Sequence, residues 1–137
     1  MTEHTLLAAL LKLLRVRLPK SFVIRKHADY ASAGCPDVSI TGNGLTSWWE
    51  AKHAKPRIIG TELQLVEAKR LEIAGYCRYI VYQESGFYRY SGIVRPSNVG
   101  ANGYFQYEQA SQKEADHAFI CNFIETVHGT SGLGQIL

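Results

Sequence analysis

The feature that most constrains the fold of this sequence is a Gly-Asn-Gly turn signal at residues 42–44, between two segments in which polar and apolar residues alternate. Glycine and asparagine accept the positive φ that tight turns need, so the flanking segments are predicted to pair as antiparallel strands. If the connection spans residues 42–45, Thr41 pairs with Thr46. Asp37 then lies directly opposite Glu50, and the hairpin brings two carboxylates together.

The second segment of the hairpin also contains a lysine close to the carboxylates. Glu50 and Lys52 are two residues apart, so in a strand their side chains point to the same face. A slip of one residue in the pairing would send Glu50 to the opposite face. Two like charges this close repel unless something positive lies between them. A divalent metal ion, with Lys52 beside it, would remove the repulsion between Asp37 and Glu50.

These residues form a recognisable motif. The sequence GCPDV at residues 34–38, followed by WWEAK at residues 48–52, resembles the PD-(D/E)XK nuclease superfamily. The Gly-x-Pro-Asp form, and a helix predicted over residues 61–75 that contains Gln64, are most like the virus-type replication-repair nuclease (VRR-NUC) branch. The resemblance covers about residues 22–81, a little under half of the chain.

The resemblance implies a phosphodiesterase that cleaves DNA with Mg²⁺ or Mn²⁺. Asp37, Glu50 and the backbone carbonyl of Ala51 would bind the ion, because hard divalent cations prefer oxygen ligands. Lys52 would orient or activate the attacking water and offset the negative charge that develops on the phosphate. The alternative is that Glu50 and Lys52 form only a solvated ion pair, worth at most about 1 kcal/mol.

Two further candidate site residues each have a structural alternative. Members of the superfamily often bring a carboxylate from a first helix to the metal, and Glu3 is placed to do so. An acid in the first turn of a helix also simply favours the helix dipole, by about 0.3–1 kcal/mol. Gln64 would lie beside the active site by resemblance, but Thr61 and Gln64 also have the spacing of a capping box.

Basic residues flank the predicted carboxylate pair. The net charge of +3 alone would not identify a nucleic-acid-binding protein. Neutralising phosphates, however, supplies most of the non-specific affinity for DNA, so the position of the basic residues matters more than their sum. We therefore expect nucleic acid to contact the basic residues nearest the motif, namely Arg25, Lys26, His53, Lys55 and Arg57. The alternative is a solvated helix face and a basic loop.

The chain as a whole predicts one α/β domain over residues 1–137, a restriction-endonuclease-like fold in the order α-β-β-β-α-β-β-α. A mixed sheet of about four to five strands would be flanked by helices, with helices over residues 2–17, 61–75 and 111–127. The strand-helix-strand succession from Trp48 to Ile80 implies a right-handed crossover and parallel pairing. In the middle helix, the spacing of Leu63, Val66, Arg70 and Ala74, with Leu71 alongside, predicts a buried stripe. Segment 96–107 is expected to be irregular.

Composition indicates the compartment and the partners. Three widely spaced cysteines without a CxxC pair indicate free thiols in a reducing compartment. The N-terminus lacks the pattern of a signal peptide, and no stretch approaches the roughly 20 apolar residues that span a membrane. We therefore expect a cytoplasmic protein with DNA as its partner, RNA as an alternative substrate, no membrane partner and a possible homodimer.

The expected role is structure-selective cleavage of branched, junction or flap DNA in replication, repair or recombination. The alternative function is a catalytically silent module of the same fold that binds nucleic acid or a protein.

Overall fold

The computed structural model describes residues 3–27, 34–53, 57–85, 87–115 and 117–130, with only the backbone of residues 3–5, 83–85, 87–90 and 111–115. The elements follow in the order α1 (Glu3–Arg17), β1 (Val23–Lys26), β2 (Val38–Gly42), β3 (Leu45–His53), α2 (Glu62–Ala74), β4 (Tyr76–Ser85), β5 (Phe87–Val94), the 3-10 helix η1 (Pro96–Asn98), β6 (Gln109–Ala115) and α3 (His117–Val127).

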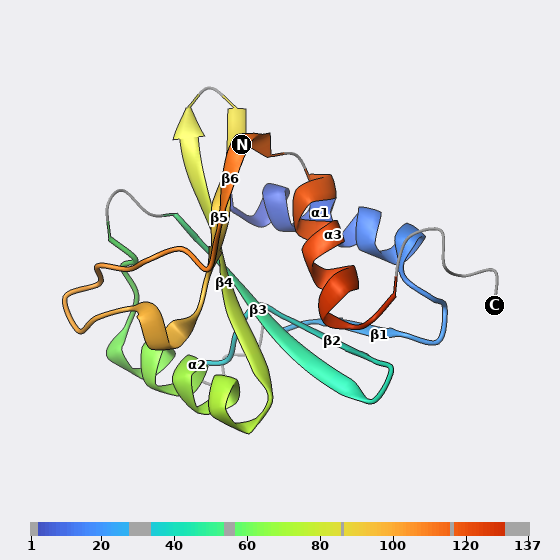
Figure 1. Cartoon of the computed structure of the whole chain (residues 1–137), viewed down its shortest axis with the longest axis horizontal. Helices are drawn as coiled ribbons and strands as arrows, with labels where there is room; N and C mark the ends of the chain where they lie inside the picture. Colours follow the sequence, from blue (N-terminus) through green and yellow to red (C-terminus); the bar gives the residue numbers. More distant parts are fainter. Residues whose placement is uncertain (1–2, 28–33, 54–56, 86, 116, 131–137) are drawn as a thin grey trace.

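The strands form one mixed sheet between two layers of helix. In the described part of the chain the sheet has six strands in the order β1-β2-β3-β4-β5-β6. Strands β3 and β4 pair in parallel, as the strand-helix-strand pattern predicted, and the other neighbours are antiparallel. Helices α1 and α3 cover one face of the sheet, and α2 with η1 covers the other (Figure 1). The predicted α/β class with a mixed sheet is therefore confirmed.

The β2–β3 hairpin has the predicted register. Asn43 and Gly44 adopt positive φ values of 52° and 77°, and they are the two residues of the turn between paired Gly42 and Leu45. The connection is thus shorter than the predicted four residues, because pairing continues to the edge of the turn. Thr41 pairs with Thr46, as expected, and their hydroxyl oxygens lie 2.8 Å apart.

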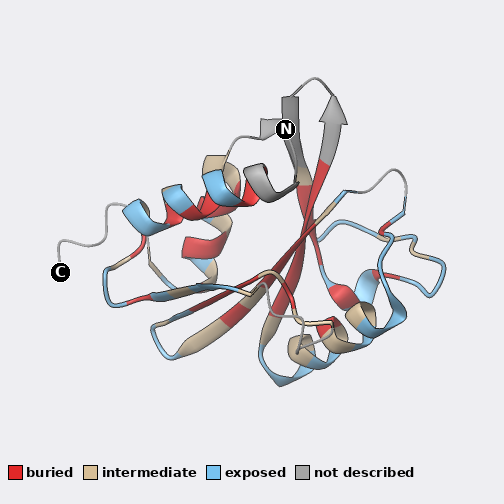
Figure 2. Cartoon of the chain, turned by 180° about the vertical axis from the view of Figure 1, so that it is seen from behind, coloured by how far each residue is buried: buried red, intermediate tan, exposed pale blue. Residues whose placement is uncertain are grey.

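Each face of the sheet has its own apolar core. On one face the leucines of α1 pack with α3 and with strand residues such as Trp49, which is 1% exposed. Figure 2 shows the buried residues along the central strands and on the side of α1 that faces the sheet. On the other face, Ala68 of α2 packs with Cys77, Tyr79 and Val81 of β4. None of the helices described is long and apolar enough to cross a membrane.

Two predicted elements differ from the structure. Residues 109–115 form strand β6 beside β5, so the predicted start of the last helix at Ser111 is wrong and α3 begins at His117. The predicted sheet of about four to five strands therefore lacked β6, and the predicted order of elements omitted it. The stripe predicted for α2 is right only for Leu71, which packs toward the sheet. Leu63 and Val66 are 51% and 47% exposed, and Leu65 and Ala68 make the other contacts with the sheet.

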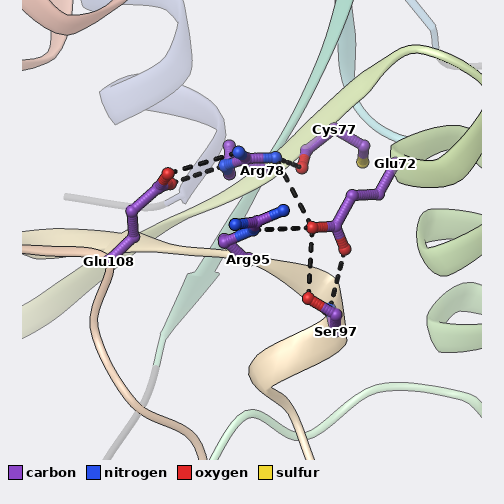
Figure 3. A network of polar contacts seen from close by, with 6 residues as sticks. All are labelled: Glu72, Cys77, Arg78, Arg95, Ser97 and Glu108. Carbon is purple, nitrogen blue, oxygen red and sulfur yellow. Dashed lines mark hydrogen bonds and ion pairs between the residues drawn. The ribbon is translucent and has the colours of Figure 1, made fainter.

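A partly buried ion-pair network ties α2 to the strands beneath it (Figure 3). Glu72 accepts hydrogen bonds from Arg95 Nε at 2.8 Å and from the Ser97 backbone N–H at 2.8 Å, and Arg78 Nη1 lies 3.7 Å from its carboxylate. Arg78 also donates to both carboxylate oxygens of Glu108, at 2.5 and 3.2 Å. The network joins the end of α2 to β4, to η1 and to the segment before β6.

The Glu72 carboxylate is expected to stabilise the fold in a pH-dependent way. Burial alone would raise its pKa, but the hydrogen bonds from Arg95 and Ser97 and the charge of Arg78 bring the pKa below the ordinary 4.5. A lowered native pKa contributes stability that is present above pH 4.5 and is lost as pH falls through the native pKa. Glu72→Gln should therefore reduce the free energy of unfolding at pH 7 by about 1–3 kcal/mol, and the difference should shrink below pH 4.5.

Urea denaturation of the two proteins across pH 3–7 measures this difference. Glu67→Gln on the same helix is the control, because Glu67 lies 3.8 Å from Arg70 in an exposed pair that is worth less than about 1 kcal/mol. Equal losses in both variants, or a loss for Glu72→Gln that does not change with pH, would contradict the prediction.

Candidate active site

The hairpin places the two predicted carboxylates together on the sheet face that α2 covers. Val38 pairs with Trp49, so the next pair outward is Asp37 opposite Glu50. Asp37 Oδ2 accepts a hydrogen bond from the backbone N–H of Ala51 at 3.0 Å, which fixes the Asp37 side chain over the end of β3. The register and this hydrogen bond place the Asp37 side chain beside the Glu50–Ala51 segment of β3.

Because Glu50 is buried, its negative charge acts strongly on the neighbouring side chains. Glu50 is only 4% exposed, whereas Asp37 and Lys52 are partly buried. On the neighbouring parallel strand β4, Glu50 pairs with Tyr79. Burial raises the pKa of the Cys77 thiol to about 12, and the negative charge of Glu50 is the second cause. The same two causes raise the pKa of Tyr79 above its ordinary value. The raised pKa keeps the Cys77 thiol protonated at neutral pH.

Lys52 contacts the first turn of α2 through Gln64. The Lys52 ammonium Nζ donates to Gln64 Oε1 at 3.1 Å. The same oxygen accepts from the Thr61 backbone N–H at 3.1 Å, and the Gln64 N–H donates to Thr61 Oγ1 at 3.1 Å, which completes a capping box. In one side-chain position, Gln64 thus completes the capping box and contacts Lys52. The start of α2 and the end of β3 hold the lysine between them.

Gly60 allows this close arrangement. A Cβ atom at residue 60 would lie 2.7 Å from Gln64 Oε1 and 3.1 Å from Lys52 Nζ. Real Cβ atoms are essentially never found at the shorter distance, so any other residue would displace the Lys52–Gln64 contact. A glycine directly before a capping threonine was the signal for a close approach.

A cleft of about 690 Å³ opens next to Lys52, and sequence reasoning missed it. One wall consists of residues 57–61 and the first turns of α2, and the other is the loop at residues 99–103. The Ile58 N–H donates to the Gly103 carbonyl at 2.8 Å, and Arg57 and Tyr104 form an isolated antiparallel bridge. The cleft depends on contacts between segments about 45 residues apart, which no local pattern reveals.

The remaining predicted site residues are dispersed. Arg57 lines the cleft, and Arg25 and Lys26 are exposed on edge strand β1. Strand alternation puts His53 on the face opposite Lys52, where its ring lies 5.4 Å from that of Tyr82. The structure therefore does not bring His53 to the same face as Lys52. Glu3 begins α1, but its side chain is not described, and Lys55 lies outside the described residues.

The donor set fits a hard divalent cation better than zinc. Asp37, Glu50 and the Ala51 carbonyl are oxygen donors, and Mg²⁺ typically binds one or two carboxylates while it keeps several waters. Structural zinc needs four nitrogen or sulfur ligands. Among the described residues no group of three or more His, Cys, Asp and Glu side chains could hold a metal. A magnesium site would therefore need the backbone carbonyl and water to complete its ligands.

Comparison with known proteins adds no family. The chain matches no protein-family model and no curated protein. The interpretation of the site therefore depends on the residues themselves. Those residues are two carboxylates on neighbouring strand positions, a lysine on the same face and a glutamine that accepts a hydrogen bond from the lysine.

Proposed function

We propose that this chain is a metal-dependent nuclease of the PD-(D/E)XK type, similar to the VRR-NUC branch, that hydrolyses phosphodiester bonds in DNA. The observation that supports the proposal most directly is the hairpin register, which sets Asp37 opposite Glu50 with Lys52 on the same face. A buried carboxylate such as Glu50 is costly unless a positive group compensates it. A site for a cation explains why two acids converge at this point of the sheet.

Asp37, Glu50 and the Ala51 carbonyl are the groups that would hold Mg²⁺ or Mn²⁺. The Asp37–Ala51 hydrogen bond keeps the first carboxylate within one peptide unit of the other two donors. When bound, such an ion supplies Lewis-acid stabilisation of the phosphate and lowers the pKa of a water ligand. The protein contributes the fixed oxygen donors and excludes solvent from the buried side of the site.

Lys52 is the residue proposed to act on the phosphate and on the attacking water. Its ammonium group is a compact charge with protons that can be donated to a phosphate oxygen. The contact with Gln64 Oε1 orients that group before substrate binds, because Gln64 is itself fixed by the capping box. A preorganised charge stabilises developing negative charge without further reorganisation. Gln64 is therefore a positioning residue for Lys52.

Incubating the purified protein with labelled branched, flap, duplex and single-stranded DNAs tests the proposal. We expect cleavage with Mg²⁺ or Mn²⁺, no cleavage with chelator, and a preference for DNA that contains a junction or an unpaired strand. A matched set of RNAs tests whether the protein cleaves RNA instead of DNA. Absence of metal-dependent cleavage on every substrate would contradict the nuclease proposal and favour a binding module.

A further inference from the structure

Backbone contacts join the two walls of the cleft beside Lys52. Its walls are joined by the Ile58–Gly103 hydrogen bond at 2.8 Å and by the Arg57–Tyr104 bridge. A Cβ atom at Gly103, whose φ is 85°, would lie 2.6 Å from the Ile58 carbonyl oxygen, so the two walls are packed backbone to backbone. Backbone contacts therefore hold the two walls of the cleft together in this structure.

The lining of the cleft combines an apolar interior with positive charge. Its volume of about 690 Å³ is within the range of about 300–1,000 Å³ that small-molecule sites occupy. Apolar side chains line both walls, among them Ile59, Val66 and Ala101. Ile59 and Val66 are 71% and 47% exposed, so their apolar side chains are accessible to a ligand in the cleft.

Charged groups in the lining favour an anion. Three cations, Lys52, Arg57 and Lys69, line the cleft, against one acid, Glu62. The cleft thus has the character expected for a group with an apolar flat body and a negatively charged end. A nucleotide fits that description, because its base has apolar faces and its phosphate carries the charge.

We propose that this cleft binds one unpaired nucleotide, with the phosphate toward the Lys52 end and the base between Val66 and the loop at residues 99–103. The inference rests on the proposed nuclease function, since it makes the cleft a subsite next to the reacting phosphate. A base inside a duplex is stacked and cannot enter a side compartment, whereas an unpaired base enters at little cost. The cleft would therefore select DNA with an unpaired nucleotide near the cleavage position.

The test combines a variant that fills the cleft with DNA that lacks one base. Val66→Trp places a large side chain in the cleft without altering Asp37, Glu50 or Lys52. Ile73→Trp is the matched control, because Ile73 lies on the same helix, is 88% exposed and does not line the cleft. Binding of a labelled flap duplex is measured in chelator, so that nothing is cleaved, with an abasic residue placed in turn at each unpaired position.

We expect one abasic position to weaken binding to the parental protein and to Ile73→Trp about tenfold, and to weaken binding to Val66→Trp by less than about twofold. Val66→Trp should bind the intact flap about tenfold more weakly, and the flapless duplex nearly unchanged. Ala101→Trp, which fills the cleft from the opposite wall, should reproduce the result and guards against misfolding of one variant.

Additive effects of the abasic residue and Val66→Trp, or equal losses on flap and flapless DNA, would overturn the subsite. The binding cycle needs no chemistry, so its outcome is separate from the nuclease proposal. If the binding measurements give the expected result but the protein cleaves no DNA, the subsite would be supported and only the nuclease function overturned.

Discussion

Replacing Lys52 with alanine is expected to lower the single-turnover rate of DNA cleavage by on the order of a hundredfold or more, which is the usual effect of losing one preorganised electrostatic group. Metal affinity should stay nearly intact, because the carboxylates that would bind the ion remain. DNA affinity should also change little, since Arg57 and Lys69 still line the adjacent cleft. The effect on rate is therefore expected to separate from the effects on binding.

Two further variants make the Lys52 test specific. Lys52→Arg keeps the charge, but its planar guanidinium does not match the geometry of the Gln64 Oε1 contact, so we expect most of the rate loss to persist. Lys12→Ala removes the same charge from an exposed position on α1, across the sheet, and should leave the rate unchanged. A Lys52→Ala protein that cleaves at close to the parental rate would falsify the nuclease assignment, because Lys52 would then be only an ion-pair partner.

The geometry of the carboxylate pair was predictable because a local signal determines it. The Gly-Asn-Gly turn permits positive φ at Asn43 and Gly44, and the turn then fixes every pair along the hairpin. Parallel pairing of β3 with β4 was predictable for a similar reason, since a helix between two strands allows few connections. Short-range chemistry was sufficient in both cases.

Elements that depend on distant partners were not predictable from the sequence. Segment QASQKEA at residues 109–115 contains no β-branched or aromatic residue, yet it forms β6 because the edge of β5 supplies backbone partners. The buried face of α2 was misjudged because Leu63 and Val66 have helical spacing and are apolar, but Ala68 is the residue that packs on the sheet.

The cleft was hidden from sequence reasoning for the same reason. Arg57 was predicted to contact nucleic acid from its place in a basic segment, and the cleft gives it a specific location. The opposite wall comes from the loop at residues 99–103, which the sequence indicated only as irregular. The link between the two walls is the hydrogen bond from Ile58 to Gly103. Such a pairing of two loops leaves no periodic signal in either segment.

Neutralising either carboxylate is expected to abolish metal binding while the fold persists. Asp37→Asn and Glu50→Gln each remove one anionic donor and keep the shape of the side chain. The amide oxygen of asparagine can still accept the Ala51 N–H, so the Asp37 variant should retain the hairpin. Calorimetric titration with Mg²⁺ or Mn²⁺ should give measurable heat for the parental protein and none for either variant.

Thermal unfolding gives a second measure of the carboxylate pair, with opposite signs in the two conditions. In chelator, Glu50→Gln should raise the melting temperature by a few degrees, because it removes a buried charge that is opposite another carboxylate. With excess Mg²⁺ the parental melting temperature should rise by ligand binding to the native state, and that of Glu50→Gln should not. Glu62→Gln is the control, since it removes an exposed acid at the cleft and should respond to Mg²⁺ like the parental protein. A Glu50→Gln protein that melts below the parental protein in chelator and is still stabilised by Mg²⁺ would show that the pair binds no metal.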